Sequence, residues 1–524
     1  MKTAKDYSRA EKQIYRPENK TCPNCGAELK RSHTAWRKNI ITLRGTLQVT
    51  SYAYRCPNSR CPNPGTVYRS AEAETLSIKY YQYGLDVIAK VGHLRFREYR
   101  TIRKAKRMLR DRFRLPISRS EVDLLGQAYL ALLQAHRRSD DALLEKLRMN
   151  GGVVLAIDGV QPEKGNETLW ILRDVTSGET LLARNLPSAD TESIASLLSE
   201  VKAMRVPVRG VVSDAQRSIR LAVERELPGV PHQLCHFHYL RNIARPVSEM
   251  DRALKVDVKR RVRGIRRVER RAALEGGEEA RVVQRYCAAI RVALLDDGSY
   301  PLRPGGLLLC RRLTAIRESI RRSDELRRSW SLESLLAVLG VLDEVAPRVR
   351  RLRRLQRLVV EANSILKQKE SSKEVQEDVC GYVERLRDLH PRCREDGAAV
   401  QNILRFTDSY WGGLFHSYDH SEIPRTNNGL EAFIRSLKAG HRRTTGWASC
   451  QGFILRYGAY VALLDRSASQ REVLGWFRLV EWDEFCGCYL GVRGFRVGVG
   501  LRRVVSRDLG GFLRSLELDW ARAV

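Results

Sequence analysis

The chain has 524 residues, 43% of them hydrophobic, and its 93 Lys and Arg against 61 Asp and Glu give a formal net charge of +32. This length exceeds one domain, the hydrophobic fraction supports folded cores, and the positive charge favours a polyanion such as DNA as partner. No apolar run approaches the ~18 residues of a membrane span and the start has no signal-peptide core, so we expect a cytoplasmic, nucleoid-associated protein with no membrane partner.

Two cysteine pairs lie near the start of the chain. Cys22 and Cys25 form the first, and Cys56 and Cys61 follow after 30 intervening residues. Between the pairs, residues 40–43 and 47–54 alternate like the strands of a hairpin. Four thiolates on two short turns can hold one Zn²⁺ tetrahedrally, which is typical of a zinc ribbon. We therefore predict a small β zinc ribbon over residues 1–75. The spacing leaves open whether it contacts DNA or only supports a neighbouring domain.

Residues 76–148 are predicted to be helical. Helices are expected over 83–91 and 98–113, and Ser118 and Glu121 form a capping box that opens a third. A linker helix should follow over 134–144. Short helices, a sharp turn and a basic flank favour a helix-turn-helix module, with the start of the third helix reading a DNA groove. A helical linker with a solvated basic face is the alternative.

The segment 149–245 has the pattern of an α/β domain. Strands are expected over 152–157, 168–175 and 180–185, then a helix over 189–204 and a strand over 208–212. Asp158 closes the first of these strands and Asp214 follows the last. A helix over 216–226 and a strand over 230–234 then lead to Cys235 and His238. This is the element order of a ribonuclease-H-like core, which places the two acids side by side. Neighbouring carboxylates are costly unless divalent cations with oxygen ligands lie between them.

Residues 246–405 read as an all-α insertion. Residues 251–360 contain 27 Lys and Arg against 14 Asp and Glu, a net of +13. Basic residues of this kind can simply lie on a solvent-exposed helix face. Their place between the two halves of the predicted core, however, favours phosphate binding. Helix breaks or turns are expected at Gly305-Gly306, at Pro347 and over 367–377. The candidate DNA-binding residues of the insertion are Arg260, Arg261, Arg263, Arg266 and Arg267.

The second part of the core is predicted over 406–466. Glu431 lies just inside an amphipathic helix pattern, and a further apolar helix is expected over 452–464. Asn427 or Asn428 can cap the helix of Glu431, or contact DNA. Residues 467–524 have no assigned role, and strands are expected over 491–505. Candidate phosphate-binding residues along or after the helix of Glu431 are Arg435, Lys438, Arg442 and Arg443.

Taken together, Asp158, Asp214 and Glu431, with Cys235-x-x-His238 and Asn427-Asn428-x-x-Glu431, resemble the DDE transposases. The resemblance covers roughly residues 150–465. It is nearest to the Mutator, IS256 and ISL3 group, which carries a helical insertion between the second Asp and the Glu. It implies an α/β ribonuclease-H-like catalytic core with a large all-α insertion, preceded here by the zinc ribbon and the helix-turn-helix.

The resemblance also implies a function. The chain would be a DNA transposase that cleaves the ends of an insertion sequence and joins them to target DNA, as a homodimer or higher oligomer on double-stranded DNA. Asp158, Asp214 and Glu431 would hold Mg²⁺ or Mn²⁺. Cys235 and His238 would pack behind the acids or contact DNA, with zinc binding there a lesser alternative. Trp411 is either a core residue or a platform for a flipped base. Competing acids are Glu163, Asp174, Asp419 and Glu422. The alternative functions are a nuclease or resolvase without strand transfer, and a domesticated DNA-binding protein.

Overall fold

The computed structural model divides the chain into two compact units. Unit 1 comprises Met1–Pro207 and Gly429–Val524, and unit 2 comprises Val208–Asn428. No helix among the described residues is long and apolar enough to cross a membrane. The residues that the structure describes are 5, 7–138, 140–161, 167–389, 394–446, 450–465 and 467–523.

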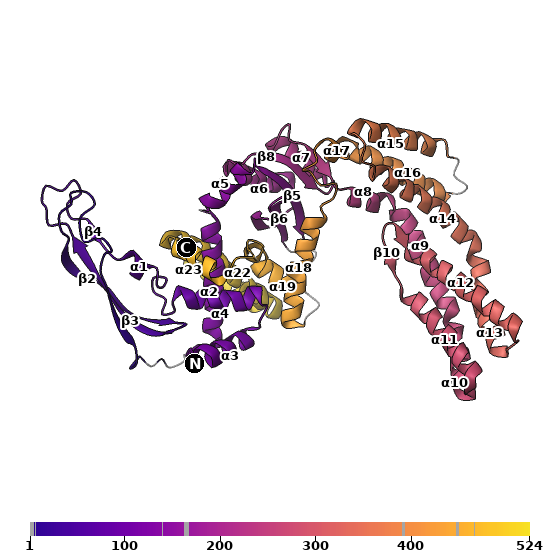
Figure 1. Ribbon diagram of the computed structural model, residues 1–524, viewed down its shortest axis with the longest axis horizontal. Coiled ribbons are helices and arrows are strands. Elements are labelled where there is room, and N and C mark those ends of the chain that lie inside the picture. The colour runs from indigo at the N-terminus through magenta and orange to yellow at the C-terminus, as the bar shows by residue number, and fades with distance from the viewer. Residues whose placement is uncertain are drawn as a thin grey trace. The chain divides into compact units, whose positions relative to one another are not determined.

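Unit 1 begins with a small sheet around a long antiparallel hairpin (Figure 1). The predicted hairpin is confirmed, with longer strands than expected, since Thr42 pairs with Gly45 at the turn and Lys30 with Arg55 at the open end. The Leu43 amide donates to Asp86 Oδ2 at 2.8 Å, which ties the turn to the following helices. The elements are β1 (Glu11–Tyr15), β2 (Lys30–Thr42), β3 (Gly45–Arg55), β4 (Val67–Tyr68) and α1 (Ala71–Glu74).

The predicted helical segment of unit 1 exists, with two corrected boundaries. The second helix begins at Ile102 rather than at residue 98, because Thr101 caps it and Tyr99 has a φ of 54°. The third helix opens at the expected capping box but runs to Arg138, and Asp140 caps a separate helix, so residues 134–144 are not one linker helix. The elements are α2 (Leu85–Gly92), the π-helical turn η1 (His93–Arg97), α3 (Ile102–Phe113), α4 (Arg119–Arg138) and α5 (Asp141–Met149).

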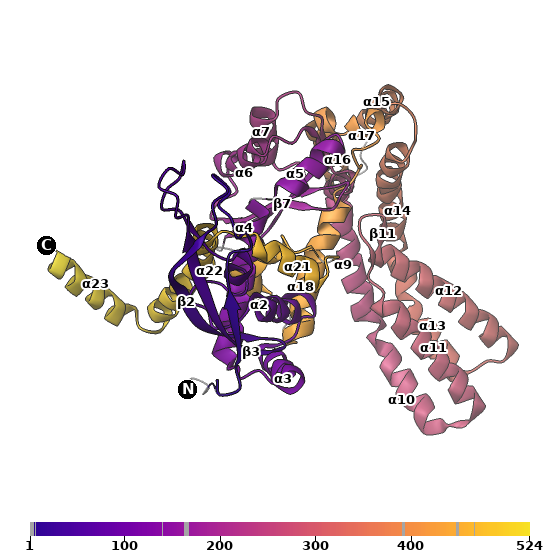
Figure 2. The same cartoon turned by 60° about the vertical axis from the view of Figure 1, so that its left-hand side comes forward.

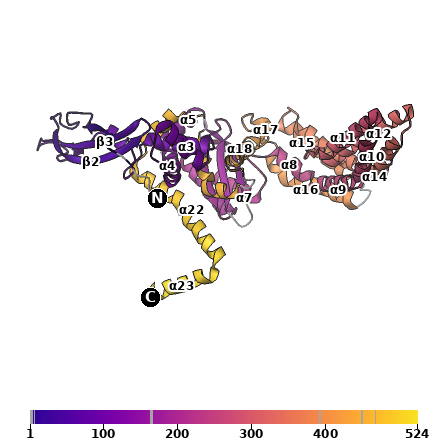
Figure 3. The same cartoon turned by 90° about the horizontal axis from the view of Figure 1, so that it is seen from below.

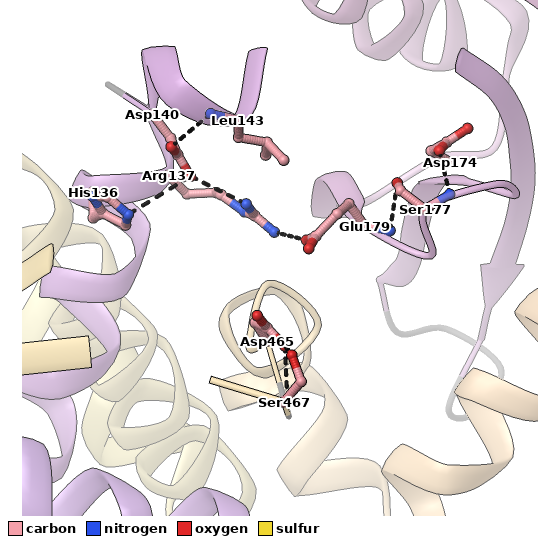
Figure 4. A network of polar contacts seen from close by, with 9 residues as sticks. All are labelled: His136, Arg137, Asp140, Leu143, Asp174, Ser177, Glu179, Asp465 and Ser467. Atoms are coloured by element: carbon pink, nitrogen blue, oxygen red, sulfur yellow. Dashed lines mark hydrogen bonds and ion pairs between the residues drawn. The ribbon is translucent and has the colours of Figure 1, made fainter. Parts of the chain in front are cut away.

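An antiparallel sheet follows in unit 1, with β6 between β5 and β7. Its elements lie close to the predicted ranges: β5 (Val153–Val160), β6 (Thr168–Asp174), β7 (Thr180–Leu186) and α6 (Thr191–Ala203). Arg137 joins this sheet to the end of α4 (Figure 4). Its guanidinium pairs with Glu179 in the β6–β7 turn and, at 3.3 Å, with Asp140.

The last part of unit 1 is helical, and the strands expected over 491–505 are wrong. Residues 482–507 form one helix, which packs against α4 through Phe485, Cys488 and Val492 at helical spacing. Figure 3 shows α22 and α23 as successive helices. The elements are α18 (Asn428–Thr445), α19 (Gln451–Phe453), η4 (Ile454–Gly458), α20 (Ala459–Val461), α21 (Gln470–Arg478), α22 (Trp482–Arg507) and α23 (Leu509–Ala523).

Unit 2 begins with a parallel strand pair, and its predicted elements again match closely. They are β8 (Val208–Ser213), α7 (Arg217–Glu226) and β9 (His232–Leu234); the helix α8 (His236–Ile243), which was not predicted, follows. Long helices then pack around one continuous apolar core; α10 to α13 lie side by side (Figure 2). They are α9 (Arg245–Arg261), η2 (Val262–Gly264), α10 (Ile265–Glu275), α11 (Gly277–Leu295), α12 (Gly305–Leu326), α13 (Trp330–Leu339), α14 (Val341–Leu366), α15 (Ser372–Arg387), α16 (Arg394–Tyr410), η3 (Trp411–Gly413) and α17 (His416–Asp419), with the short pair β10 (Gly298–Ser299) and β11 (Arg303–Pro304) before α12.

Of the breaks expected in the insertion, the one at Pro347 lies inside a helix, whereas the other two open or precede a helix. Pro347 is an interior residue of α14 and cannot donate the usual backbone hydrogen bond. The buried residues of α14, from Val341 to Leu366, stabilise the helix despite this loss. Gly305 and Gly306 open α12, and the buried Asp251 carboxylate caps it by accepting from the Gly306 and Leu307 amides at 2.7 and 2.8 Å. The polar stretch after Leu366 does contain the expected break, since α15 begins only at Ser372.

Candidate functional site

The four N-terminal cysteines converge. The Sγ atoms of Cys22, Cys25, Cys56 and Cys61 all lie within 4.8 Å of one another, with 3.7 Å between Cys22 and Cys61 and 3.4 Å between Cys25 and Cys56. Thiolates in a tetrahedral zinc site stand about 3.8 Å apart, because each Zn–S bond is about 2.3 Å long. The cluster therefore fits one zinc ion. Among the residues that the structure describes, this is the one group of His, Cys, Asp or Glu that meets the spacing of a metal site.

The surroundings of this cluster favour metal binding over simple packing. Leu29 is the one other buried residue in its apolar cluster, too little to fold this end of the ribbon. The Tyr68 hydroxyl lies 3.5 Å from Cys22 Sγ, and this hydrogen bond is the main reason that the pKa of Cys22 falls to about 6. A lower pKa favours the thiolate, which is the metal-binding form, whereas burial raises the pKa of Cys56 to about 12. Tyr68 is a supporting residue that the cysteine spacing did not reveal.

Asp158 lies within a strand rather than at its end. β5 continues to Val160, and Asp158 pairs with Ile171 of β6. The strand extends because Gly159 and Val160 still pair with Trp170 and Leu169. The Asp158 side chain is half-buried, and its Oδ1 accepts from the Gly159 amide at 2.8 Å. The carboxylate is thus held at a fixed position on a rigid sheet.

Asp214 and Glu431 begin new elements, as expected. Asp214 directly follows β8, is half-buried, and accepts from the Gln216 amide at 3.1 Å before α7 starts. Glu431 lies in the first turn of α18 and is also half-buried. Asp158 and Glu431 belong to unit 1 and Asp214 to unit 2.

Two contacts hold α18 against the rest of unit 1. The Arg173 guanidinium of β6 lies 4.1 Å from the Phe433 ring centroid. Gly440 faces the Tyr99 ring so closely that a Cβ atom there would lie 2.1 Å from it. These contacts fix the rotation of the helix and hence the direction of Glu431. Neither Arg173 nor Tyr99 stood out in the sequence, since their partners are hundreds of residues away.

Cys235 connects the segment of Asp214 to the segment that precedes Glu431. Its backbone amide donates to the Ser213 carbonyl at 2.9 Å, one residue before Asp214. Its Sγ accepts from the Asn427 amide at 3.3 Å, four residues before Glu431, and the next amide, of His236, donates to the Arg425 carbonyl at 2.9 Å. Cys235 is fully buried. The Cys-x-x-His motif and the Asn-Asn motif, 192 residues apart, are therefore in direct contact.

The histidines around Cys235 are structural in this arrangement. The His236 ring bonds the Leu414 carbonyl at 2.8 Å, and the His232 ring bonds the Ser213 hydroxyl at 2.8 Å. Burial lowers the pKa of both rings to about 4. His238 is half-buried on α8. Among the described residues, none of these histidines belongs to a group with the spacing of a metal site, so the alternative of zinc at this position has no support there.

The competing acids have other contacts or positions. Asp174 is buried, and its carboxylate accepts from the Val154 and Ser177 amides at 3.0 and 2.7 Å (Figure 4). Asp419 accepts from the Ser372 amide at 3.2 Å. Glu422 is exposed in a turn before α18. Glu163 lies outside the described residues. Trp411 is half-buried and packs edge-on against Phe415 at 5.1 Å, which favours a packing role over a base platform.

The predicted arginines of the insertion divide into two groups. Arg260 and Arg261 pair with Asp257 at 3.0 and 3.1 Å, and Arg261 also pairs with Glu344. Arg263, Arg266 and Arg267 are exposed, and within the described chain they have no ion-pair partner. The second group is the one free to bind phosphates. On α18, Arg435, Arg442 and Arg443 are exposed and Lys438 is half-buried. Asn427 is buried, and Asn428 is exposed at the first position of the helix.

The predicted groove-reading helix has little free surface. The middle of α4, from Val122 to Ala135, is almost entirely buried against neighbouring helices of unit 1. Arg119 and Ser120 in its first turn are exposed, as is Arg138 at its end. DNA reading by this helix would therefore be confined to its two ends.

Comparison with known proteins adds one similarity of shape. No protein-family model matches the chain, and no curated protein does. Among solved structures, the chain is similar to one described as the Drosophila P element transposase strand transfer complex. The identity is 11%, the TM-score is 0.31, and the match covers 75% of this chain and 94% of that chain.

Proposed function

We propose that this chain is a DNA transposase that performs metal-dependent strand cleavage and strand transfer at the ends of an insertion sequence. The observation that carries the proposal is the position of Cys235 between the residue before Asp214 and the residues before Glu431. It supports the view that two acids far apart in sequence serve one site. The chain order of β5, β6, β7, α6, β8, α7 and β9 supports a ribonuclease-H-like core around them.

Three half-buried carboxylates, Asp158, Asp214 and Glu431, would hold two Mg²⁺ or Mn²⁺ ions in this proposal. Carboxylate oxygens are the ligands that such hard cations prefer. The ions would supply activation of a water or a 3′-hydroxyl and stabilisation of the leaving oxygen during in-line displacement at phosphorus. The strand β5 and the first turn of α18 would hold the acids at fixed positions, since catalysis of this kind depends on positioning.

Both units carry exposed positive charge that suits DNA. The exposed cations Arg263, Arg266 and Arg267 on the insertion would bind phosphates, as would Arg435, Arg442 and Arg443 on α18. Phosphate contacts fix register but carry no sequence information. Recognition of element ends is therefore assigned to the N-terminal part of unit 1, with Zn²⁺ in the four-cysteine cluster stabilising the ribbon.

A strand-transfer assay tests the proposal. The full chain is incubated with Mg²⁺, a labelled mini-element carrying the DNA that flanks its gene, and a supercoiled target plasmid. We expect labelled ends covalently joined to the plasmid. Cleaved but unjoined ends would instead indicate a nuclease or resolvase. Binding without any cleavage would indicate a DNA-binding protein whose core has lost its activity.

A further inference from the structure

A cavity in unit 1 combines aromatic rings with unpaired positive charge. It has a volume of about 910 Å³ and lies between the hairpin strand β2, the segment after α1, and the helices α21 and α22. This volume lies in the range of binding sites for small organic groups. The cavity is separate from the three acids and from the four cysteines, none of which line it.

The aromatic wall of this cavity is held open to solvent. Tyr80 is 82% exposed and has a φ of 66°, a conformation that side chains other than glycine rarely adopt. Its ring meets Trp482 edge-on at 5.8 Å, and Trp482 rests on the buried Phe485 at 5.7 Å. The backbone conformation of Tyr80 thus keeps an aromatic side chain exposed to solvent. Such outliers concentrate at binding sites.

Lys38 fixes the segment that carries Tyr80. Its ammonium donates to the Ser77 hydroxyl at 2.7 Å and to the Ile78 carbonyl at 2.9 Å. Burial lowers the pKa of Lys38 to about 8. The neighbouring Lys79 ammonium lies 5.3 Å from the Tyr80 ring centroid and 5.9 Å from that of Trp482. A cation therefore lies over both rings.

The charge lining the cavity is positive. Its cations are Arg37, Lys38, Arg69, Lys79 and Arg478, against the acids Glu74 and Glu481. Glu74 already accepts from the Trp36 indole at 2.9 Å. In the described part of the chain, the four cations other than Lys38 have no ion-pair partner. Exposed aromatic rings that alternate with cations are the usual platform for unstacked bases and their phosphates.

We propose that the cavity between β2 and the α21–α22 segment binds an unpaired nucleotide of a DNA strand, with its base stacked on Tyr80 or Trp482 and its phosphate near Arg37 and Lys79. A recessed cavity admits one base but excludes a duplex, whose bases are stacked inside the helix. This inference rests on the proposed function only in taking DNA as the partner. It adds a site for a melted or frayed strand, away from the acids.

The test measures fluorescence anisotropy of the full chain, without Mg²⁺, on a labelled 12-nucleotide single strand and a duplex of equal length. At least one of Tyr80→Ala and Trp482→Ala should weaken single-strand binding by about 5- to 100-fold, the range for loss of one stacked base. Duplex binding, which depends on phosphates, should be unchanged. The control Trp520→Ala removes an aromatic residue that is 75% exposed on α23, outside the cavity, and should change neither affinity.

Further variants exclude a merely structural effect. Tyr80→Phe keeps the ring and should bind the single strand like the parent, and all variants should keep the parental zinc content. A 2-aminopurine in the strand should be quenched by the parent and less so by Trp482→Ala. The proposal is overturned if both alanine variants keep parental single-strand affinity, or if duplex affinity falls by the same factor. Because no cleavage is measured, a chain that binds single strands here but never joins DNA would refute strand transfer alone.

Discussion

At the scale of single residues, the surroundings of Cys235 depend on buried neutral groups. His236 follows it directly and bonds the Leu414 carbonyl, and burial lowers the His236 pKa to about 4, with the Arg425 charge adding to the effect. In an unfolded chain this ring titrates near 6.5. The neutral ring is therefore part of the folded state, and protonation opposes folding.

Protonation of His236 links the stability of the folded chain to pH. Between pH 6.5 and pH 4 the unfolded chain binds the His236 proton and the folded chain does not, so stability falls as the pH falls. We expect His236 to lower the free energy of unfolding by about 2 kcal/mol between pH 7 and pH 5. His236→Gln keeps a donor for the Leu414 carbonyl and should show a flatter pH dependence in urea unfolding. Equal loss in parent and variant would show that His236 does not titrate in this way.

At the scale of elements, the basic insertion helices have a defined outer face. Val262, Ile265 and Val268 are buried, whereas Arg263, Arg266 and Arg267 between them are exposed. Arg260 and Arg261 on the preceding turn are engaged with Asp257. Two sets of arginines in one short stretch therefore differ in availability to phosphates, and they form a matched pair for mutation.

Replacing Arg263, Arg266 and Arg267 together with Gln should weaken binding to all duplex sequences alike. Each lost phosphate contact lowers the slope of log affinity against log salt by about 0.9, so the triple variant should lose roughly 2 to 3. The double variant Arg260→Gln with Arg261→Gln should change the slope much less. If the double variant flattens the slope as much as the triple, the ion pairs with Asp257 do not persist on DNA.

Most elements could be predicted from the sequence, because strand and helix periodicities are local. The strands of the sheet and the helices α6 and α7 fall within a few residues of their predicted ranges. The errors arise where tertiary packing outweighs local preference. α22 is rich in Gly, which disfavours helices, and in Val, which favours strands, yet Phe485, Cys488 and Val492 bury one helical face. Pro347 reads as a break, but packing along α14 outweighs its missing hydrogen bond.

The site was predictable only in part, for a similar reason. Cysteine spacing revealed the four-thiol cluster, because those ligands lie on two short turns. Contacts such as Cys235 to Asn427, Arg173 to Phe433 and Tyr99 to Gly440 join residues more than 190 positions apart. No local pattern encodes such pairs. The aromatic cavity around Tyr80 was missed entirely, since it forms between the two ends of the chain.

At the scale of the whole molecule, we expect recognition of element ends and DNA cleavage to depend on different parts of the chain. The four-cysteine cluster is remote in sequence from the acids, and its end of the ribbon has almost no apolar core of its own. A domain of this kind folds through its metal. Loss of zinc should therefore remove the recognition of element ends without removing DNA cleavage.

Cys22→Ser combined with Cys25→Ser should release the zinc and unfold the cysteine end of the ribbon. Base contacts are worth about 1 to 3 kcal/mol each, so preference for element ends over scrambled duplex should fall at least about fivefold. Binding by the basic insertion and weak Mg²⁺-dependent nicking should remain. The control Cys380→Ser changes an exposed cysteine of α15 outside the cluster. Unchanged end preference despite measured zinc loss would exclude the ribbon from recognition.

We propose that Asp158, Asp214 and Glu431 form one metal-dependent catalytic site. The most direct measurement compares DNA cleavage and DNA binding for Asp158→Asn, Asp214→Asn and Glu431→Gln, with Glu422→Gln as the matched control from the exposed turn before α18. Each of the three replacements removes a proposed metal ligand and keeps the side chain's shape. We predict that all three replacements abolish Mg²⁺-dependent cleavage and retain parental affinity for the element ends. The control Glu422→Gln should both bind and cleave like the parent. A Glu431→Gln protein that cleaves at the parental rate would contradict the account.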